Sequence, residues 1–385
     1  MGAIVLLILG VVALFVRPRR VPLWVLPSAF AVVGLASTLI RWPDVHGSVT
    51  LLRNPLLFLL FAVPLAVLLD RLGLFEALAA TVDGGRHLVL GLWVLAAFVT
   101  VVFNLDAAVV LLTPLYIRVA ARHGLPAEAL AFQPALLACL ASSPLPVSNL
   151  TNLIVAERFH LDVVDFVVHL GAPTLAAVAV GWFAYRRVAS VESDSDGIDA
   201  TVDPAALRRG LPIVAFVLVG FTAGDAVGVP AWVVAAVATA WAVVLVRELP
   251  WRRVPYEAML VAAALSVLVA GAVPHLGLHT VLRGTGIAGD LRALAFGVVG
   301  SDLANNLPAV LAGSASLHTQ HQVWPLLVGV NIGPAFVLTG ALSGLLWRDT
   351  AASFGVHVSA RRYSSVGIRV GVPALLAAVI VVLFL

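Results

Sequence analysis

The sequence predicts an all-helical protein that crosses a membrane many times, and three observations predict it. Its 385 residues are 61% hydrophobic and only 11% charged, with a mean hydropathy of +1.06. Soluble domains are about 45–50% apolar and about 25% charged. The charged residues gather in short stretches, which leaves apolar segments such as 211–224, 230–246 and 366–385 about long enough to cross a bilayer. A soluble core does not need so many helices that are apolar all round.

Apolar runs and helix-breaking residues predict ten spans along the chain. They cover about 2–16, 21–40, 55–72, 130–157, 161–185, 211–226, 230–247, 256–274, 322–347 and 366–385. The first run is followed, not preceded, by the basic segment RPRR at 17–20. A cleaved signal peptide needs the reverse order, so this run is predicted to be a retained first span.

Two further apolar pairs are predicted to form re-entrant hairpins, which enter and leave on the same side. Residues 88–103 and 107–122 are separated by the polar tip Asn104-Leu105-Asp106. Residues 289–300 and 307–317 are separated by the sequence SDLANN. Non-helical backbone at membrane depth is tolerated only where protein buries it or where it lines a water-filled cavity.

The placement of the arginines predicts which side each loop faces. The proposed outer loops hold only five arginines, and 17 others lie on the proposed cytoplasmic side, with Arg369 near the last span left uncounted. The five outer ones are Arg41, Arg53, Arg158, Arg283 and Arg292. This bias agrees with the positive-inside rule and predicts that both ends of the chain face outward.

Residues 188–207 form the only long polar stretch and are predicted to be a flexible cytoplasmic linker. The linker divides the chain into residues 1–187 and 208–385, each with about five spans, one hairpin and one interrupted span. Because each half has an odd number of spans, the second half would run inverted relative to the first. Inverted repeats of this kind are common in secondary transporters, with the substrate site between them.

Four polar breaks inside apolar segments are the candidate functional segments. They are FNLDAAVVLLTP (103–114), SSPLPVSNLTNL (142–153), GSDLANNLPAVLAG (300–313) and GVNIGPAFVLTGALSGLL (329–346). Proline and glycine interrupt the helix and free backbone groups, while amides and hydroxyls can replace the hydration of a small polar solute. Any single break could instead serve helix packing, but four breaks in corresponding positions favour a transport pathway.

Asp106 and Asp302 are the candidate groups for coupling transport to protons. A carboxylate deep in a bilayer is costly and usually functional. The alternative for both residues is an N-terminal cap on the helix that follows. The single cysteine, Cys139, is interpreted as a packing residue because one thiol cannot form a multi-thiolate site.

The composition and motifs also exclude several classes of protein. The arginines lie at the ends of spans and not along one face, so the basic pI of about 9.6 does not indicate a nucleic-acid binder. The chain has no Walker A run, no nucleophile elbow and no histidine pair with metal-ligand spacing. We therefore expect no cofactor, no metal site and no enzymatic activity.

At these breaks the sequence resembles the arsenical pump membrane proteins, the arsenite and antimonite permeases of the ion transporter superfamily. The matching segments are NLDAAVVLLTP (104–114), LPVSNLTNLI (145–154), NNLPAVLAG (305–313) and NIGPAFVLTGALSGLLW (331–347), with a weaker match at LLDRLGLFEALA (68–79). They lie in both halves of the chain and keep the order of the family motifs. Asp302 has no clear counterpart in the family pattern, and the first tip has Leu105 between its Asn and Asp.

The resemblance implies export of trivalent arsenic or antimony hydroxides across the cell membrane, with protons as counter-ions. It also implies a pathway made of Asn104, Asp106, Thr113, Ser148, Asn149, Asn152, Asn305, Asn306, Asn331, Gly333 and Thr339. A cytoplasmic ATPase is a candidate partner, as in some relatives, and a second copy of the chain is another. Arsenious acid is a small neutral polyol at neutral pH, which suits a site of amides and hydroxyls.

Other transport functions stay open at this stage. A sodium/proton antiporter or an organic-anion carrier of the same superfamily is the main alternative. The related dicarboxylate carriers use Ser-Asn-Thr tips, and the nearest sequence here is Ser148-Asn149-Leu150-Thr151. A passive channel that works with an ATPase is a further alternative.

Overall fold

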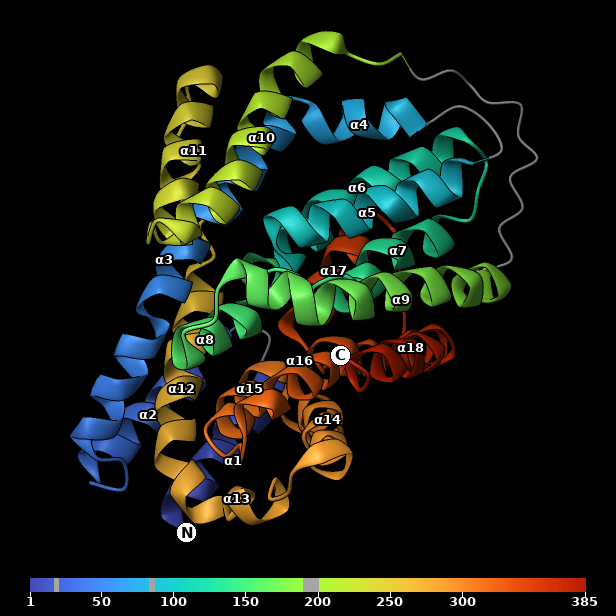
Figure 1. Cartoon of the computed structure of the whole chain (residues 1–385). Coiled ribbons are helices and arrows are strands. Elements are labelled where there is room, and N and C mark those ends of the chain that lie inside the picture. Colours follow the sequence, from blue (N-terminus) through green and yellow to red (C-terminus); the bar gives the residue numbers. More distant parts are fainter. Residues whose placement is uncertain (17–20, 83–86, 190–200) are drawn as a thin grey trace.

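The computed structural model of the chain describes residues 1–16, 21–82, 87–189 and 201–385, and every regular element in these ranges is a helix (Figure 1). Up to residue 189 the elements are α1 (Gly2–Phe15), α2 (Val25–Ala36), α3 (Trp42–Arg71), α4 (Leu74–Val82), α5 (Leu88–Phe103), α6 (Leu105–Arg122), α7 (Ala127–Leu140), η1 (Pro146–Ser148), α8 (Leu150–Phe159) and α9 (Val163–Ala189). After residue 200 they are α10 (Pro204–Ala226), α11 (Ala231–Val246), η2 (Trp251–Arg253), α12 (Tyr256–Leu276), α13 (Leu278–Val281), α14 (Gly286–Ala304), α15 (Asn306–Ser314), η3 (Gln320–Gln322), α16 (Val323–Ile332), η4 (Gly333–Ala335), α17 (Leu342–Ser353) and α18 (Ala360–Val382).

Five of the described helices are long and apolar enough to cross a membrane. They are α3, α9, α10, α12 and α18. Shorter apolar helices, among them α1, α2 and α11, accompany them. The all-helical, multi-span membrane fold predicted from composition is therefore confirmed.

Two of the predicted spans differ from the helices observed. The span expected at 21–40 is a 12-residue helix, α2, and the span expected at 55–72 is part of the 30-residue helix α3. Helix α3 begins at Trp42 because Pro43 lies in its first turn, where a proline costs no hydrogen bond. Hydropathy locates the apolar part of such a helix but not its polar continuation. The short helices α4 and α13 were not predicted.

Both arms of the first hairpin end on the same side of the molecule. Its arms are α5 and α6, and the guanidinium of Arg122, at the end of α6, lies 2.8 Å from the carboxylate of Glu76 in α4. The Tyr116 hydroxyl of α6 donates a hydrogen bond to the carbonyl oxygen of Leu92 near the start of α5, so the two arms run back along each other. This is the geometry of a helical hairpin, and its re-entry into the membrane stays a prediction.

The second hairpin, α14 and α15, closes in the same way. The ring of His321, just after α15, lies 3.3 Å from the carboxylate of Asp290 near the start of α14. The side chain of Gln322 donates a hydrogen bond of 3.1 Å to the carbonyl oxygen of Leu282, which precedes α14. Helices α4 and α13, which lead into the two hairpins, lie at the top and the bottom of Figure 1.

Two predicted spans are interrupted helices, as their sequences indicated. The segment 130–157 forms α7, a loop with η1, and α8. The segment 322–347 forms α16, η4, an irregular stretch and α17. In each case a Ser-, Pro- or Gly-rich sequence stops the first helix before the second begins.

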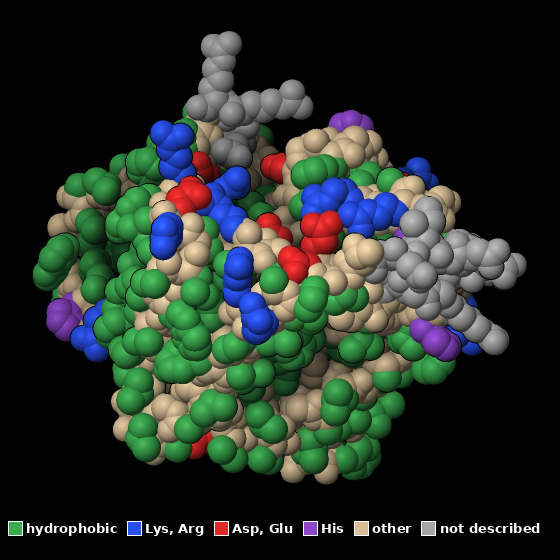
Figure 2. Space-filling view, turned by 90° about the horizontal axis from the view of Figure 1, so that it is seen from above, with side chains coloured by type: hydrophobic (Ala, Val, Ile, Leu, Met, Phe, Trp, Pro, Cys, Tyr) green, Lys and Arg blue, Asp and Glu red, His purple; other side chains and the backbone are tan. Residues whose placement is uncertain are grey.

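The helices form two packed groups. Helices α3, α10, α11 and α12 lie along the left of Figure 1 with α1 and α2, while the hairpin α5–α6 and helices α7, α9 and α18 cross the right. Helices α9 and α18, from the middle and the end of the chain, pack side by side. Seen from above, Arg, Asp and Glu side chains gather on one part of a mostly hydrophobic surface (Figure 2).

Part of the predicted linker and four of the counted arginines cannot be placed on this fold. Residues 190–200 of the linker, and Arg17, Arg19, Arg20 and Arg86, lie outside the described residues. At the two edges of the predicted linker, α9 continues to Ala189 and α10 begins at Pro204.

Candidate functional site

The tips of the two hairpins have the same unusual backbone conformation. Asn104 has φ 87° and ψ 147°, and Asn305 has φ 81° and ψ 150°. L-residues rarely adopt positive φ, and such strained residues cluster at functional sites. In each tip the asparagine side chain accepts a hydrogen bond from the backbone N–H two residues later, in Asp106 and in Leu307. Each asparagine thus caps the second arm of its hairpin.

Each tip contacts one interrupted helix. At the first tip, the amide nitrogen of Asn104 lies 3.5 Å from the carbonyl oxygen of Val147, and the Ser148 hydroxyl donates a 2.7 Å hydrogen bond to Val101 in α5. The second tip is held against the break between α16 and α17. There the Asn305 amide lies 3.3 Å from the carbonyl oxygen of Thr339, and the backbone N–H of Asn306 donates to Gly340 at 2.8 Å.

Asn331, at the end of α16, joins the two interrupted helices through four side-chain hydrogen bonds. Its Oδ1 accepts from Asn149 and from Thr151, both at 2.9 Å. Its Nδ2 donates to Asn152 Oδ1 at 2.8 Å and to Ser143 Oγ at 3.1 Å. All five residues are buried, and we call them the Asn331 cluster.

The Asn331 cluster consists of amides and hydroxyls and contains no charged side chain. Both kinds of group can donate and accept hydrogen bonds, so the cluster can exchange its internal bonds for bonds to a neutral polar solute. A site for a dianion would instead be expected to contain arginines that bind it in a bidentate manner. The chemistry of the cluster therefore favours a small uncharged ligand.

Gly333 allows close approach between the second hairpin and the second break. A Cβ atom at this position would lie 2.7 Å from the Ser301 hydroxyl and 3.0 Å from the Val298 Cα, both in α14. A side chain would push η4 away from α14. Gly333 thus serves the packing of the site through its lack of a side chain.

Asp106 faces a cavity of about 600 Å³ that lies apart from the Asn331 cluster. The charged residues that line this cavity with Asp106 are Asp70, Arg71, Arg118, Arg252 and Arg253. All four arginines belong to segments predicted to lie on the cytoplasmic side. We call this space the inner cavity.

Asp302 and Thr113 lie outside the hydrogen-bonded clusters. Asp302 lies in the neighbourhood of Cys139 and Tyr363. The Asp302 Oδ1 and Thr113 Oγ1 atoms are buried, and neither has a hydrogen-bond partner among the described residues. Within the same part of the chain, no group of three His, Cys, Asp or Glu side chains is placed to hold a metal ion.

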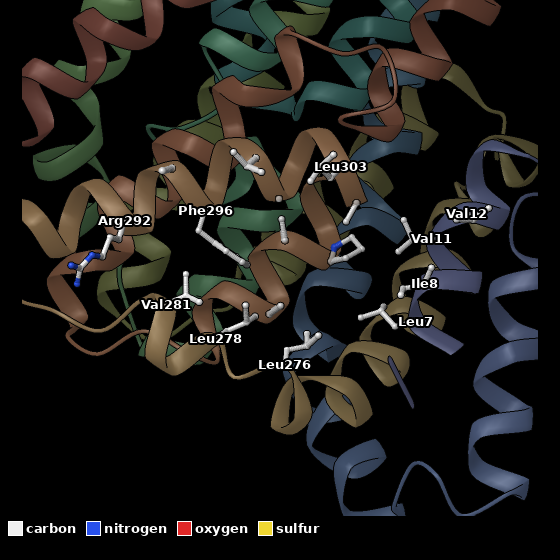
Figure 3. Close-up of a pocket in the computed structure, with 17 residues that line it drawn as sticks. Leu7, Ile8, Val11, Val12, Leu276, Leu278, Val281, Arg292, Phe296 and Leu303 are labelled. Atoms are coloured by element: carbon white, nitrogen blue, oxygen red, sulfur yellow. The ribbon is translucent and has the colours of Figure 1, made fainter. Parts of the chain in front are cut away.

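A separate cavity of about 650 Å³ is unsuited to a polar ligand (Figure 3). Its lining residues come from α1, α12, α13 and the second hairpin, and Arg292 is the one charged side chain among them. In Figure 3, Arg292 lies at one end and Ile8 of α1 at the other. The cavity is open at the surface of the molecule, where its lining residue Leu303 is 75% exposed.

Hairpins and interrupted helices that meet in a polar interior are the construction of a membrane transporter. The chain belongs to the CitMHS family, described as citrate transporters, whose pattern it matches over residues 1–381. It is accordingly a multi-pass transporter of the cell membrane.

Curated relatives match over nearly the whole chain. An arsenical pump membrane protein of Yersinia enterocolitica is 27% identical over 397 residues, covering 93% of this chain and 92% of the relative. One of Escherichia coli strain K12 is 26% identical, covering 96% of this chain and 95% of the relative. A silicon efflux transporter of Oryza sativa subsp. japonica is 28% identical over 155 residues, which is 39% of this chain and 31% of that protein. The resemblance to arsenical pump membrane proteins is thus confirmed as a family relationship.

Sequence reasoning missed two members of the Asn331 cluster and the composition of the inner cavity. Ser143 and Thr151 lie inside the predicted break at 142–153 but were not singled out. The arginines were used only to assign sides, so it was not foreseen that four of them line one cavity with Asp106. The polar sequence of the break could have indicated Ser143 and Thr151. No local sequence pattern indicates which arginines line the inner cavity.

Proposed function

We propose that the chain is a secondary active transporter that exports arsenite or antimonite from the cytoplasm in exchange for protons. The observation that carries this proposal is the uncharged, buried Asn331 cluster between the two interrupted helices. Arsenious acid is a neutral molecule with three hydroxyl groups, each of which can donate and accept a hydrogen bond. The names of the full-length relatives support the same cargo.

The proposed pathway consists of the hairpin tips, the helix breaks and the Asn331 cluster. In this proposal residues 1–187 and 208–385 are two inverted repeats. The shared conformation of Asn104 and Asn305, and their matching contacts with Val147 and Thr339, support that relation. Binding would replace contacts within the cluster by contacts with the cargo, while the capped helices α6 and α15 hold the tips in place.

Asp106 is the proposed proton-coupling residue, with Asp302 as the second candidate. Asp106 lies at the first tip and lines the inner cavity, whose other charged side chains are Asp70 and four arginines. Asp302 precedes the second tip and has a buried carboxylate oxygen with no partner in the described part of the chain. Each carboxylate could therefore take up and release a proton as the adjoining tip changes its contacts.

The test is arsenite uptake into everted membrane vesicles energised by a proton gradient. Accumulation should occur with the wild type and fall to the background of protein-free vesicles with Asp106→Asn. The matched control is Asp349→Asn, which removes an exposed carboxylate paired with Arg348 in α17. This control should transport like the wild type.

Each outcome of this assay has a distinct meaning. Unchanged transport by Asp106→Asn would move the coupling role to Asp302. If correctly folded wild-type protein accumulated no arsenite, the cargo assignment would be wrong.

An organic-anion carrier is the second candidate function. The inner cavity carries four arginines, and the family is described as one of citrate transporters. Arginine binds carboxylates well in a bidentate manner, so these side chains could concentrate an organic anion. Citrate uptake that requires sodium, together with loss of uptake in Arg252→Gln, would favour this function, whereas a sodium/proton antiporter would respond to sodium without citrate.

A cytoplasmic ATPase and a second copy of the chain are proposed partners only. If the transporter works alone, arsenite export should continue in ATP-depleted cells that keep their proton gradient. If it acts as a passive channel with an ATPase, export should stop under those conditions.

A further inference from the structure

A second polar cavity lies on the opposite side of the first helix break from the inner cavity. It has a volume of about 330 Å³ and is lined by Asn54 and Phe58 of α3, by Glu157 of α8 and by residues around the start of α11. His160, Asp162 and Asp225 also line it. All these positions belong to segments whose ends are predicted to face outward, so we call this space the outer cavity.

The outer cavity contacts the middle of α3, and the inner cavity contacts its C-terminal part. The outer cavity contacts Asn54, and the inner cavity contacts Arg71, 17 residues further along the same helix. At a rise of 1.5 Å per residue these positions are about 25 Å apart. The cavities therefore reach into the protein from opposite directions.

Their inner ends lie within two turns of each other along α3, on different faces of the helix, because five residues turn the chain by about 140°. On α3 the outer cavity ends at Phe58 and the inner cavity begins at Val63, which is about 7.5 Å along the helix. Between them Leu59 is 1% exposed and Ala62 is 3% exposed. This is little more than one turn of helix.

The first hairpin tip and the first helix break also lie between the two cavities. Val147, in the helix break, lines the outer cavity, while Asp106 and Ala107, just after the tip, line the inner cavity. The contact between them is that of the Asn104 amide with the Val147 carbonyl oxygen, at 3.5 Å, which is long for a hydrogen bond. A contact this weak can open at small energetic cost.

We propose that the outer cavity is the outward half of the transport path, and that Leu59, Asn104 and Val147 form the barrier between it and the inner cavity. This inference rests on the proposed function and names the place where the path is closed. Small movements of the first tip would connect Asp106 with the outer cavity.

The chemistry of the outer cavity fits a neutral cargo and a cationic counter-ion. The Asn54 amide donates to both carboxylate oxygens of Glu157, at 3.2 and 3.0 Å, which holds this acid in the cavity wall. Asp162 and Asp225 also line the cavity, so among the described residues its carboxylates number three, against one histidine and no arginine. These carboxylates repel anions, whereas protons and the uncharged trihydroxide of arsenic or antimony can pass.

The experiment measures the access of water-soluble thiol reagents and needs no cargo. In a Cys139→Ala background, which removes the native thiol, Ala156→Cys is placed in the outer cavity and Val110→Cys in the inner cavity. A membrane-impermeant maleimide is then added to cells, or to everted vesicles. We expect Ala156→Cys to react only from outside and Val110→Cys only from inside.

The barrier is tested by adding Leu59→Ala to the Val110→Cys protein. Removing this side chain should make Val110→Cys reactive from outside as well. The matched control is Leu65→Ala, the same change at an equally buried position of α3 that lines neither cavity. This control should leave the labelling pattern unchanged.

Three results would overturn the inference. They are reaction of Val110→Cys from outside without the barrier mutation, failure of either cysteine to react from its own side, and no effect of Leu59→Ala. Because labelling does not depend on cargo, the expected pattern in a protein that transports no arsenite would contradict only the proposed function.

Discussion

Asn331 connects the polar breaks of the two interrupted helices through side-chain hydrogen bonds. Its amide satisfies two partners at its oxygen and two at its nitrogen, and all of them are side chains from α8 or from the loop before it. Asn149, Asn152 and Asn331 could each be predicted as candidates because they interrupt apolar sequence. Their association could not be predicted, because about 180 residues of chain separate Asn331 from the others.

Replacing Asn331 by alanine should destabilise the protein and weaken cargo binding. The change leaves four buried polar groups without their partner, and each unsatisfied group costs about 1–3 kcal/mol before the site relaxes. Thermal unfolding can be followed by the reaction of the buried Cys139 thiol with a fluorogenic maleimide. The control is Ser37→Ala, which removes only an exposed bond to its own helix. Equal unfolding midpoints for the two variants would contradict a structural role for the cluster.

At the scale of elements, two glycines bring the second hairpin against the second interrupted helix. Gly297 of α14 and Gly329 of α16 face each other, and a Cβ on Gly329 would lie 2.4 Å from the Leu294 carbonyl oxygen. Helices in membranes approach closely where such small residues meet. This contact places the end of α16, and therefore Asn331, beside the second tip.

Gly329→Ala should separate α14 from α16. We expect a loss of about 1–3 kcal/mol in stability, the usual cost of overpacking, because the clash is with rigid backbone. Loss of transport should accompany it, since Asn331 lies two residues further on. The comparison is Gly47→Ala in α3, where an added Cβ meets nothing within 4 Å. Thermal unfolding as above measures the difference, and a stable, active Gly329→Ala protein would show that the contact is not required.

The existence of hairpins and breaks was predictable at this scale, but several helix boundaries were not. Proline, glycine and asparagine within apolar runs mark the tips and breaks because they cannot continue a buried helix without cost. The shortness of α2 and the presence of α4 depend on which neighbours bury them. Hydropathy carries no information about that choice.

At the scale of the whole molecule, ion pairs join segments that the arginine count places on one side. Arg122 pairs with Glu76, Arg362 with Glu128, and Arg71 with Glu248. All three pairs connect ends of helices predicted to face the cytoplasm. The predicted sidedness and the tertiary contacts are therefore consistent with each other.

Epitope tags provide the direct test of this topology. Tags at residue 1 and residue 385 should bind antibody on intact cells, and a tag within residues 190–200 should bind only after permeabilisation. The reason is the excess of arginines on the linker side, which opposes translocation of those loops. A tag near Gly228, between α10 and α11, serves as the outward control. Binding of the linker tag on intact cells would invert the assignment of inner and outer cavities.

The sequence by itself determined the membrane environment, the helical class, the family and the segments that carry the polar residues. These follow from local properties, since a bilayer requires long apolar helices and penalises every polar interruption. Only the tertiary structure decided that Asn331 joins both breaks, that four arginines line the same cavity as Asp106, and that two cavities contact neighbouring stretches of α3. Those features arise where distant segments pack together, and the energy of such packing depends on several segments at once. No single stretch of the sequence determines it.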